Sequence, residues 1–391
     1  MKIRWLLILI IISISCKPEN KRLFEFDPRK LVENKITLSE IADDIRYIPL
    51  DNKYPLGLIY DKIMVINNSI YLSALNVGVL VFNKEGKLFR KIGTIGRGPG
   101  EYIHNFNFAV NEKTETIYVC DGGNIIKIYS KTGDFLRSFS LQEYGSSVDV
   151  IDIYNSKFFA SYNLEFEDTK YDWIVLDTLG NLIKKQERTT PKFLCNAGSP
   201  GGTYKYENLL SFWNVFTDTV FSILPDLTQL PSFIISPGEH RLPKSRISSI
   251  EQMSKYMLLQ QIFETSRFID IRYGYCFPVS KYALVLIDKK NNKSFLTFLK
   301  SDGSYITEYT GGIINDLDGG TGFLPKSYFV ENGREYMVGL INPYRIKDRI
   351  RNDEFKNSIP KYPEKKKEFE RLANSLIETD NPVLMMVRLK K

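Results

Sequence analysis

The sequence contains few of the residues from which catalytic and metal sites are most often built. It has four cysteines and two histidines among 391 residues. His104 and His240 are far apart in the chain, and neither has a second ligand at a zinc spacing. No Ser-His-Asp arrangement can be assigned either. We therefore predict no metal site and no cofactor, and the catalytic residues, if there are any, remain unknown at this stage.

Cysteine is also too scarce for a disulfide framework. Apart from Cys16, which is discussed below, the chain has Cys120, Cys195 and Cys276, and three cysteines cannot all pair with one another. Their separations of 75 and 81 residues match no zinc motif. We expect one or more buried free thiols that behave as small apolar side chains.

Long apolar runs and nucleic-acid patches are absent as well. After the N-terminus no stretch reaches the roughly eighteen apolar residues that a membrane-spanning helix needs. The formal net charge is +7, but no basic run is interleaved with aromatic residues as in a groove for single strands. The densest basic run, 361–367, contains Glu364 and is followed by further glutamates. We therefore expect a solvated helix face there and no nucleic-acid partner.

The N-terminus has the pattern of an export signal. Lys2 and Arg4 precede a short apolar run at 5–12, and Ser13-Ile14-Ser15-Cys16 resembles a lipobox, in which small residues precede a cysteine that becomes lipidated. A plain secretory signal with an unmodified Cys16 is the alternative.

The lipobox interpretation divides the chain into three parts. It predicts a signal peptide at 1–15, a lipidated Cys16 with a polar tether at 16–34, and a folded domain at 35–391. The acyl chains would hold the protein on a membrane surface without a transmembrane helix.

A repeat with a fixed interval runs through the first half of the folded part. Gly86, Gly133 and Gly180 are 47 residues apart both times, and each lies between two apolar segments. A glycine after a short polar stretch suits a hairpin turn with positive φ. Two further short strands precede the second and third hairpins. Four strands in about 47 residues are the size and content of one propeller blade.

The later units are less regular. A fourth unit lacks the turn glycine, a fifth follows an insertion, and a sixth begins near 327. Two segments, 244–265 and 362–378, have apolar residues near helical spacing and predict short helices.

The two ends of the folded part are expected to meet in the last blade. An open ring would leave sheet edges unpaired, so we predict that 46–50 and Val383–Leu389 complete blade six together. The sequence therefore predicts an all-β fold, a six-bladed β-propeller with two short helical insertions.

Three motifs carry a family resemblance. The segments 37–50, 92–102 and 380–384 resemble the opening, the signature loop and the closing strand of bacterial six-bladed β-propeller lipoproteins, which are related to NHL-repeat propellers. The resemblance covers nearly the whole mature chain. It implies the fold and a place in the cell envelope, as a lipoprotein anchored in the outer membrane of a Gram-negative bacterium on an unspecified side. It implies no particular chemistry.

The glycine-rich loop 93–101 is the first candidate binding site. Its backbone N–H groups could cradle an anion, and Arg97, Glu101 and Tyr102 would then be the side chains involved. It lacks the pattern of a phosphate loop. The alternative is a structural crossing between blades, with Pro99 directing the path and an ion pair between Arg97 and Glu101.

The aromatic residues, 23 Tyr and 25 Phe, supply the second candidate. Most should pack between blades, but Tyr204 and Tyr206 could line a face that binds sugar or peptide. Glu112, Glu115 and Asp152 lie in or beside predicted strands and are expected to be solvated.

Three classes of function remain open. We favour a non-catalytic module that binds a protein, peptide or glycan on one propeller face. The alternatives are an enzyme, a lyase or hydrolase, with its site in the central channel, and a scaffold or accessory subunit of an envelope complex. Clustered carboxylates or histidines in the channel would favour the enzyme, and a large exposed apolar patch would favour the scaffold.

Overall fold

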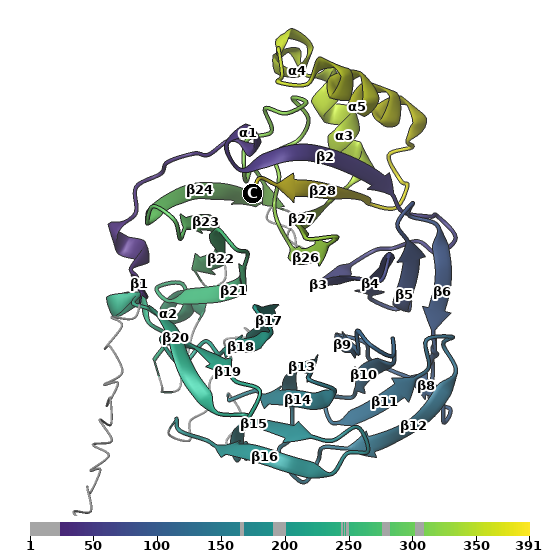
Figure 1. The fold of residues 1–391 in the computed structure, drawn as a ribbon, viewed down its shortest axis with the longest axis vertical. Helices are drawn as coiled ribbons and strands as arrows, with labels where there is room; N and C mark the ends of the chain where they lie inside the picture. The colour runs from purple at the N-terminus through teal and green to yellow at the C-terminus, as the bar shows by residue number, and fades with distance from the viewer. Residues whose placement is uncertain are drawn as a thin grey trace, which may run out of the picture.

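Six mainly antiparallel sheets of four or five strands are arranged in a ring around a central axis (Figure 1). The computed structural model describes residues 24–164, 168–190, 201–243, 245, 247, 250–275, 282–301 and 309–391. The predicted six-bladed β-propeller is confirmed. The signal peptide and the cysteines Cys16, Cys195 and Cys276 lie outside the described residues. Within those residues, no helix has the length and apolar character needed to cross a membrane.

The first three blades follow the 47-residue repeat. Each is a four-stranded meander whose strands run in chain order from the axis to the rim. Their strands are β3 (Ile59–Ile66), β4 (Ser69–Ala74), β5 (Gly78–Asn83) and β6 (Leu88–Ile92); β9 (Asn107–Val110), β10 (Ile117–Asp121), β11 (Ile125–Tyr129) and β12 (Phe135–Ser140); and β13 (Val148–Tyr154), β14 (Lys157–Tyr162), β15 (Tyr171–Leu176) and β16 (Leu182–Glu187).

The repeated glycines have the predicted hairpin role. Gly86, Gly133 and Gly180 have φ values of 82°, 90° and 98° in the turns between the third and fourth strands. A Cβ at Gly86 would lie 2.1 Å from the carbonyl oxygen of Pro49, in the neighbouring blade. Turn geometry and close packing between blades therefore both require glycine there.

Blade four keeps the repeat without the glycine. Leu227, 47 residues after Gly180, takes φ 67° in the equivalent turn. The blade also gains a fifth strand, because β1 pairs in parallel with the outer strand β20. The prediction that 16–34 is a polar tether is therefore wrong from residue 24 onward, since Phe26 is buried in the core. The strands are β1 (Phe24–Phe26), β17 (Gly202–Tyr206), β18 (Leu209–Trp213), β19 (Thr219–Ile223) and β20 (Gln229–Ile235).

Blade five contains the main error of the sequence prediction. The helix predicted at 244–265 is limited to α2 (Ile250–Met253), and 257–264 is instead the inner strand β21. A bulge between Leu259 and Gln261 breaks the two-residue alternation of this strand, which made its apolar spacing resemble a helix. The strands are β21 (Met257–Glu264), β22 (Phe268–Tyr275), β23 (Tyr282–Asp288), β24 (Lys293–Ser301) and β25 (Tyr309–Thr310).

Blade six closes the ring as predicted. The C-terminal strand β28 (Val383–Leu389) lies between β27 (Arg334–Ile341) and the N-terminal strand β2 (Ala42–Pro49), and β26 (Ser327–Glu331) is innermost. Asn381 fastens this junction: its side chain accepts from Leu56 N at 2.7 Å and donates to the carbonyls of Asp51 and Tyr54, both at 2.7 Å.

Helices are few and short. Three of them are inserted between β27 and β28. The last of these, α5, lies within the predicted 362–378. Phe369 of this helix is buried and packs against Tyr47. The remaining elements are small connections. The bounds are η1 (Pro28–Lys30), α1 (Leu38–Ile41), η2 (Gly238–His240), α3 (Pro343–Arg351), α4 (Asp353–Asn357), α5 (Pro363–Ser375) and the short parallel pair β7 (Thr94–Ile95) and β8 (Glu101–Tyr102).

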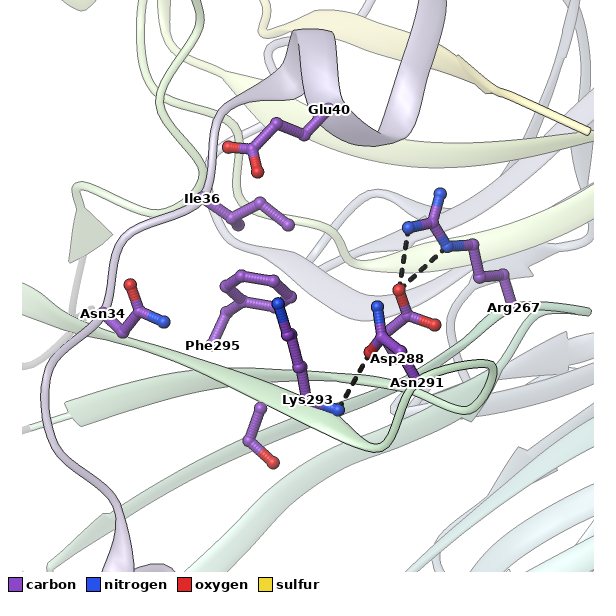
Figure 2. Close-up of a pocket in the computed structure, with 9 residues that line it drawn as sticks. Asn34, Ile36, Glu40, Arg267, Asp288, Asn291, Lys293 and Phe295 are labelled. Carbon is purple, nitrogen blue, oxygen red and sulfur yellow. Dashed lines mark hydrogen bonds and ion pairs between the residues drawn. The ribbon is translucent and has the colours of Figure 1, made fainter.

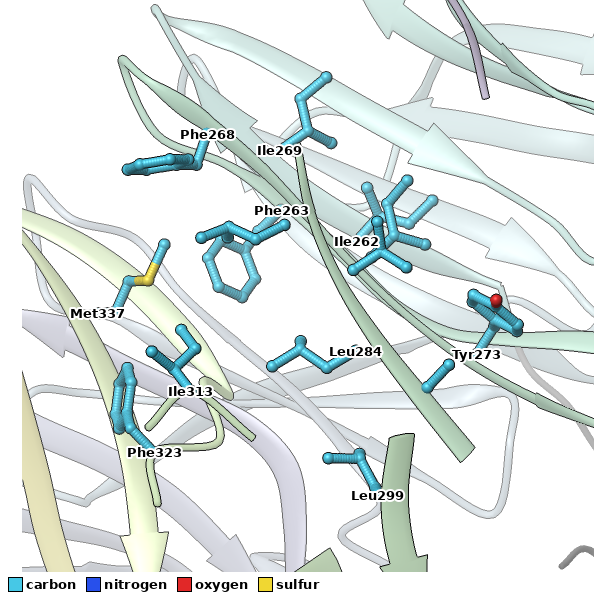
Figure 3. Close-up of a cluster of buried hydrophobic side chains, with 14 of the residues drawn as sticks. Ile262, Phe263, Phe268, Ile269, Tyr273, Leu284, Leu299, Ile313, Phe323 and Met337 are labelled. Atoms are coloured by element: carbon cyan, nitrogen blue, oxygen red, sulfur yellow. The ribbon is translucent and has the colours of Figure 1, made fainter. Parts of the chain in front are cut away.

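The core lies between neighbouring blades. Figure 3 shows one part of it, where Phe263 of blade five packs near Met337 of blade six and Phe323 of the preceding connection. Burial of such side chains contributes roughly 1.5–3 kcal/mol each. Cys120 is a buried free thiol, as predicted.

The two faces of the ring are distinguished by the six inner strands, β3, β9, β13, β17, β21 and β26. We call the face at which these strands begin the start face; it carries the connections from one blade to the next, including 93–106. The opposite face, where the inner strands end in tight turns such as Asn67-Asn68, is the end face. The helices between β27 and β28 belong to the start face.

Candidate functional site

Bulges interrupt three of the six inner strands near their beginnings. A bulge adds residues to one strand and redirects their side chains. In β3 it falls between Ile59 and Ile63, in β13 between Val148 and Val150, and in β21 between Leu259 and Gln261. The bulge of β3 contains Asp61 and Lys62, and both form ion pairs with other blades.

Asp61 is the centre of the first of these ion-pair groups. Its carboxylate lies 2.6 Å from Lys326 Nζ, which precedes β26, and 3.4 Å from Arg272 Nη2 of β22. Arg272 is almost fully buried, whereas the Asp61 side chain remains 63% exposed. Desolvation by the surrounding protein opposes ionisation of Asp61 even though solvent reaches its side chain, but the charges of Lys326 and Arg272 hold its pKa well below the usual range. Blades one, five and six therefore share this cluster.

Asp152 is the centre of the second group. Its carboxylate lies 3.3 Å from Lys205 Nζ and 3.6 Å from Lys62 Nζ, and it accepts a 3.0 Å hydrogen bond from Thr203. Burial would raise the pKa of Asp152, but the lysines Lys205 and Lys62 lower it to about 2. The expectation that Asp152 is solvated is therefore wrong, because the side chain is buried.

The second group links three blades and extends toward the end face. Lys62 of blade one reaches blade three, where its Nζ also donates to the Ile151 carbonyl at 2.9 Å. Lys205 of blade four contacts the exposed Glu112 at 2.9 Å. The two groups together form what we call the axial network: Asp61, Lys62, Asp152, Lys205, Arg272 and Lys326.

Every charged side chain of the axial network forms an ion pair with another member of it. Each carboxylate in it contacts two cations, and no histidine belongs to it. In the part of the chain that the structure describes, no group of three His, Cys, Asp or Glu side chains could hold a metal ion. The chemistry of the network is therefore that of cross-bracing between blades, with Asp61 as its exposed polar surface.

Asp270 adjoins this network and differs from it. The side chain is fully buried on β22, and its Oδ1 accepts a 3.2 Å hydrogen bond from Gln261. Its Oδ2 has no hydrogen-bond partner among the described residues. Burial raises the pKa of Asp270 to about 7, although the charge of Arg272 opposes the shift. Asp270 is thus a carboxyl group that folding keeps protonated well above its ordinary pKa.

Replacing Asp270 with Asn should stabilise the protein at high pH. The pKa of Asp270 is raised in the folded state. Its contribution to the stability of the wild-type protein is therefore complete below about pH 4 and is lost as the pH rises through about 7. Asn cannot ionise, so Asp270→Asn should be more stable than wild type at pH 8 by about 1–3 kcal/mol and equal to it near pH 4. Urea denaturation at both pH values measures this.

Asp288 supplies the matched control. It is also buried in blade five, but Arg267 holds it at 2.7 Å and, against the effect of burial, lowers its pKa. Asp288→Asn should therefore destabilise the protein at pH 8. Equal responses of the two variants would contradict this account of Asp270.

The glycine-rich loop makes the expected crossing from blade one to blade two, but with different internal bonds. Glu101 accepts from Gly98 N at 2.7 Å and from the Thr94 hydroxyl at 3.3 Å, instead of forming the predicted ion pair with Arg97. The backbone hydrogen bonds from Gly98 and Arg97 lower the pKa of Glu101. The carboxylate of the loop itself thus occupies the cradle proposed for an external anion, and Arg97 is exposed.

Tyr102 and the two other candidate tyrosines lie in different places. Tyr102 is buried, donates to the Ile92 carbonyl at 2.6 Å and accepts from Val79 N at 3.0 Å. Tyr204 is also buried, and its hydroxyl donates to Glu264 at 2.6 Å. Tyr206 lies at the end face, with Lys289 Nζ 4.0 Å from its ring centre. The structure does not bring Tyr204 and Tyr206 together with the loop 93–101.

The sequence analysis did not single out a group of exposed aromatic residues on the start face. Phe106 precedes β9, and its ring lies 5.3 Å from the ring of Tyr60 and 5.2 Å from that of His104. Phe106 is 56% exposed and the neighbouring Ile103 is 48% exposed. We call Tyr60, His104 and Phe106 the start-face aromatic cluster. The available signal was the pair of aromatic residues, His104 and Phe106, just before a predicted inner strand.

A polar cavity of about 460 Å³ lies at the rim, between blade five and the N-terminal segment (Figure 2). Of its four charged side chains, Arg267 and Asp288 are paired with each other. Glu40 and Lys293 line the cavity outside that ion pair. Its lining is Asn34, Ile36, Glu40, Arg267, Asp288, Asn291, Lys293, Ser294 and Phe295.

Comparison with known proteins gives a family and a fold. Residues 23–388 match the sequence profile of a domain of unknown function, DUF4934. A Bacteroides fragilis protein thought to be exported has a similar structure, with a TM-score of 0.69, 19% identity, and coverage of 94% of this chain and 99% of that one. A DUF4221 member from Bacteroides vulgatus is more distant, with a TM-score of 0.49, 12% identity, and coverage of 92% and 99%. No curated protein matches the sequence.

Proposed function

This chain belongs to the DUF4934 family, and we propose that it is an exported lipoprotein of the cell envelope whose propeller is a non-catalytic binding module. The observation that carries the proposal is the contrast between two regions. The charged side chains of the axial network are engaged in ion pairs with one another, whereas Phe106 of the aromatic cluster is exposed on the start face. Exposed aromatic side chains on a folded scaffold are typical of binding surfaces.

An enzyme with a site on the axis is less well supported. A general acid or base needs a proton-transfer group that a substrate can reach. Asp61 is the exposed carboxylate of the network, but Lys326 and Arg272 hold it ionised. Asp152 is held ionised between two lysines, and Asp270 is fully buried. Turnover of a bound compound, detected by mass spectrometry after incubation with the purified protein, would support the enzyme and contradict the binding module.

Export and anchoring rest on the N-terminal pattern. A signal peptide at 1–15 followed by Cys16 supports lipid attachment. The similar Bacteroides fragilis protein, itself thought to be exported, is consistent with an envelope location. The side of the membrane on which the propeller lies is left open by both observations.

Changing Cys16 to Ser should release the protein from membranes. The variant lacks the thiol that carries the acyl chains, so metabolic labelling with a radioactive fatty acid should be lost and the protein should move to the soluble fraction. Cys120→Ser is the matched control, because Cys120 is a buried thiol within blade two. Lipid labelling and membrane association that persist in Cys16→Ser would refute the anchor.

The binding function is tested with the soluble domain, residues 24–391. Saturable binding to immobilised glycans or to immobilised peptides, without chemical change of either, would support a binding module. Absence of saturable binding to both sets of compounds would contradict it.

A further inference from the structure

The start-face aromatic cluster is a small stack of rings in which Phe106 is exposed. The rings of His104 and Phe106 are nearly parallel, at 26°, with their centres 5.2 Å apart. The edge of Tyr60 meets Phe106 at 78°. Aromatic rings normally gain stability by burial. Here the Phe106 side chain is more than half exposed instead, so its position has to be maintained by other contacts.

Buried polar groups supply those contacts. The Asp121 carboxylate accepts from Ile103 N at 2.9 Å and from His104 N at 3.1 Å. Asn105 is 2% exposed; its amide donates to the Ala74 carbonyl at 2.8 Å and to Ser73 Oγ at 2.7 Å. Ser73 in turn donates to the Asn105 carbonyl at 2.6 Å. The segment 103–106 is thus fixed to blades one and two, and its aromatic rings are presented without a large ordering cost on binding.

Polar groups of the axial network lie next to the start-face aromatic cluster, because Asp61 directly follows Tyr60 in the chain. Tyr60 is followed by Asp61, whose carboxylate is 63% exposed at the start of the inner strand β3. Lys326 binds that carboxylate from the start of blade six. A ligand resting on the aromatic rings would therefore have hydrogen-bond acceptors and donors toward the axis.

This combination fits a sugar ring. A pyranose has one face of C–H groups, which packs against a flat aromatic ring, and a rim of hydroxyl groups, which both donate and accept hydrogen bonds. A peptide ligand would instead use an open strand edge or an apolar pocket, and the described cavity is polar and lies at the rim. Resting on the proposed binding function, we propose that the start-face aromatic cluster is a subsite for a carbohydrate chain.

The test compares the start-face aromatic cluster with an exposed aromatic residue elsewhere on the ring, in the domain of residues 24–391. Phe106→Ala and His104→Ala should each weaken binding to a glycan array by about tenfold or more, as expected for loss of a stacked aromatic contact. Phe89→Ala should not change it, because Phe89 is 65% exposed but lies on β6, the outer strand of blade one. Thermal unfolding of the three variants checks that each is folded.

Further outcomes separate the subsite from the binding function itself. Glycan binding that survives Phe106→Ala would overturn the subsite and retain the binding module. Binding to peptides but not glycans would overturn the carbohydrate assignment and retain the binding module. Binding to neither would overturn both.

Discussion

A chain that ends at Asn381 is expected to lose cooperative folding of the whole ring. Residues 382–391 contain β28, which lies between β2 and β27, and its residues at 383–385, 387 and 389 are buried. Deletion leaves both neighbouring strands with unpaired backbone groups, at about 1–3 kcal/mol for each buried group. The sum exceeds the stability of an ordinary domain. Circular dichroism should show no native-like melting transition in the truncated protein.

Removal of β1 is the matched control at the other end. A protein that begins at residue 32 loses one three-residue strand from the edge of blade four. It should keep a single cooperative transition with a modestly lower melting temperature. A protein that lacks 382–391 and still melts within a degree or two of the full domain would show that the closing strand is dispensable.

Asp152→Ala is expected to cost about 3 kcal/mol of folding free energy. The substitution removes the shared counter-charge of Lys62 and Lys205, which then face each other near the axis. Breaking a buried ion pair by removing one partner typically costs about 3–5 kcal/mol. The lower end of this range applies because the side chains of Lys62 and Lys205 are about a quarter exposed to solvent. Asp348→Ala is the control, since the Asp348–Arg351 pair is on the surface and should contribute nothing measurable.

The pH dependence of the Asp152 effect has a defined sign. The folded-state pKa, about 2, is below the ordinary value of 3.8. The stabilisation is therefore complete above about pH 4 and is lost as the pH falls toward 2. Urea denaturation should show a large difference between wild type and Asp152→Ala at pH 7 and a smaller one at pH 3. A difference that does not depend on pH would assign the cost to packing instead of charge.

The outline of the fold could be predicted from local patterns. Gly86, Gly133 and Gly180 mark hairpins because a residue with positive φ favours glycine whatever surrounds it. The same signal failed in blade four, where Leu227 takes the positive φ and packs in the core. A second signal, the alternation by which a strand is recognised, failed at 257–264, where a bulge disturbs it.

The candidate sites were predicted less well. Local composition drew attention to the loop 93–101, but Glu101 folds back onto the loop backbone. Tyr102 and Tyr204 are buried. Asn105 is buried between His104 and Phe106, and its hydrogen bonds hold both of these side chains on the surface. No local sequence pattern shows this burial.

By itself, then, the sequence determined the repeat length, the hairpin turns, the export signal pattern and the two strands that close the ring. These features depend on neighbouring residues or on apolar periodicity, and both are written along the chain. Tertiary structure alone decided which charged residues meet. Lys62 and Asp152 are in different blades, and they pair because the ring brings the inner strands of blades one and three to a common axis and a bulge redirects Lys62 toward that axis. Such contacts follow from the curvature of the whole ring, which no local segment specifies.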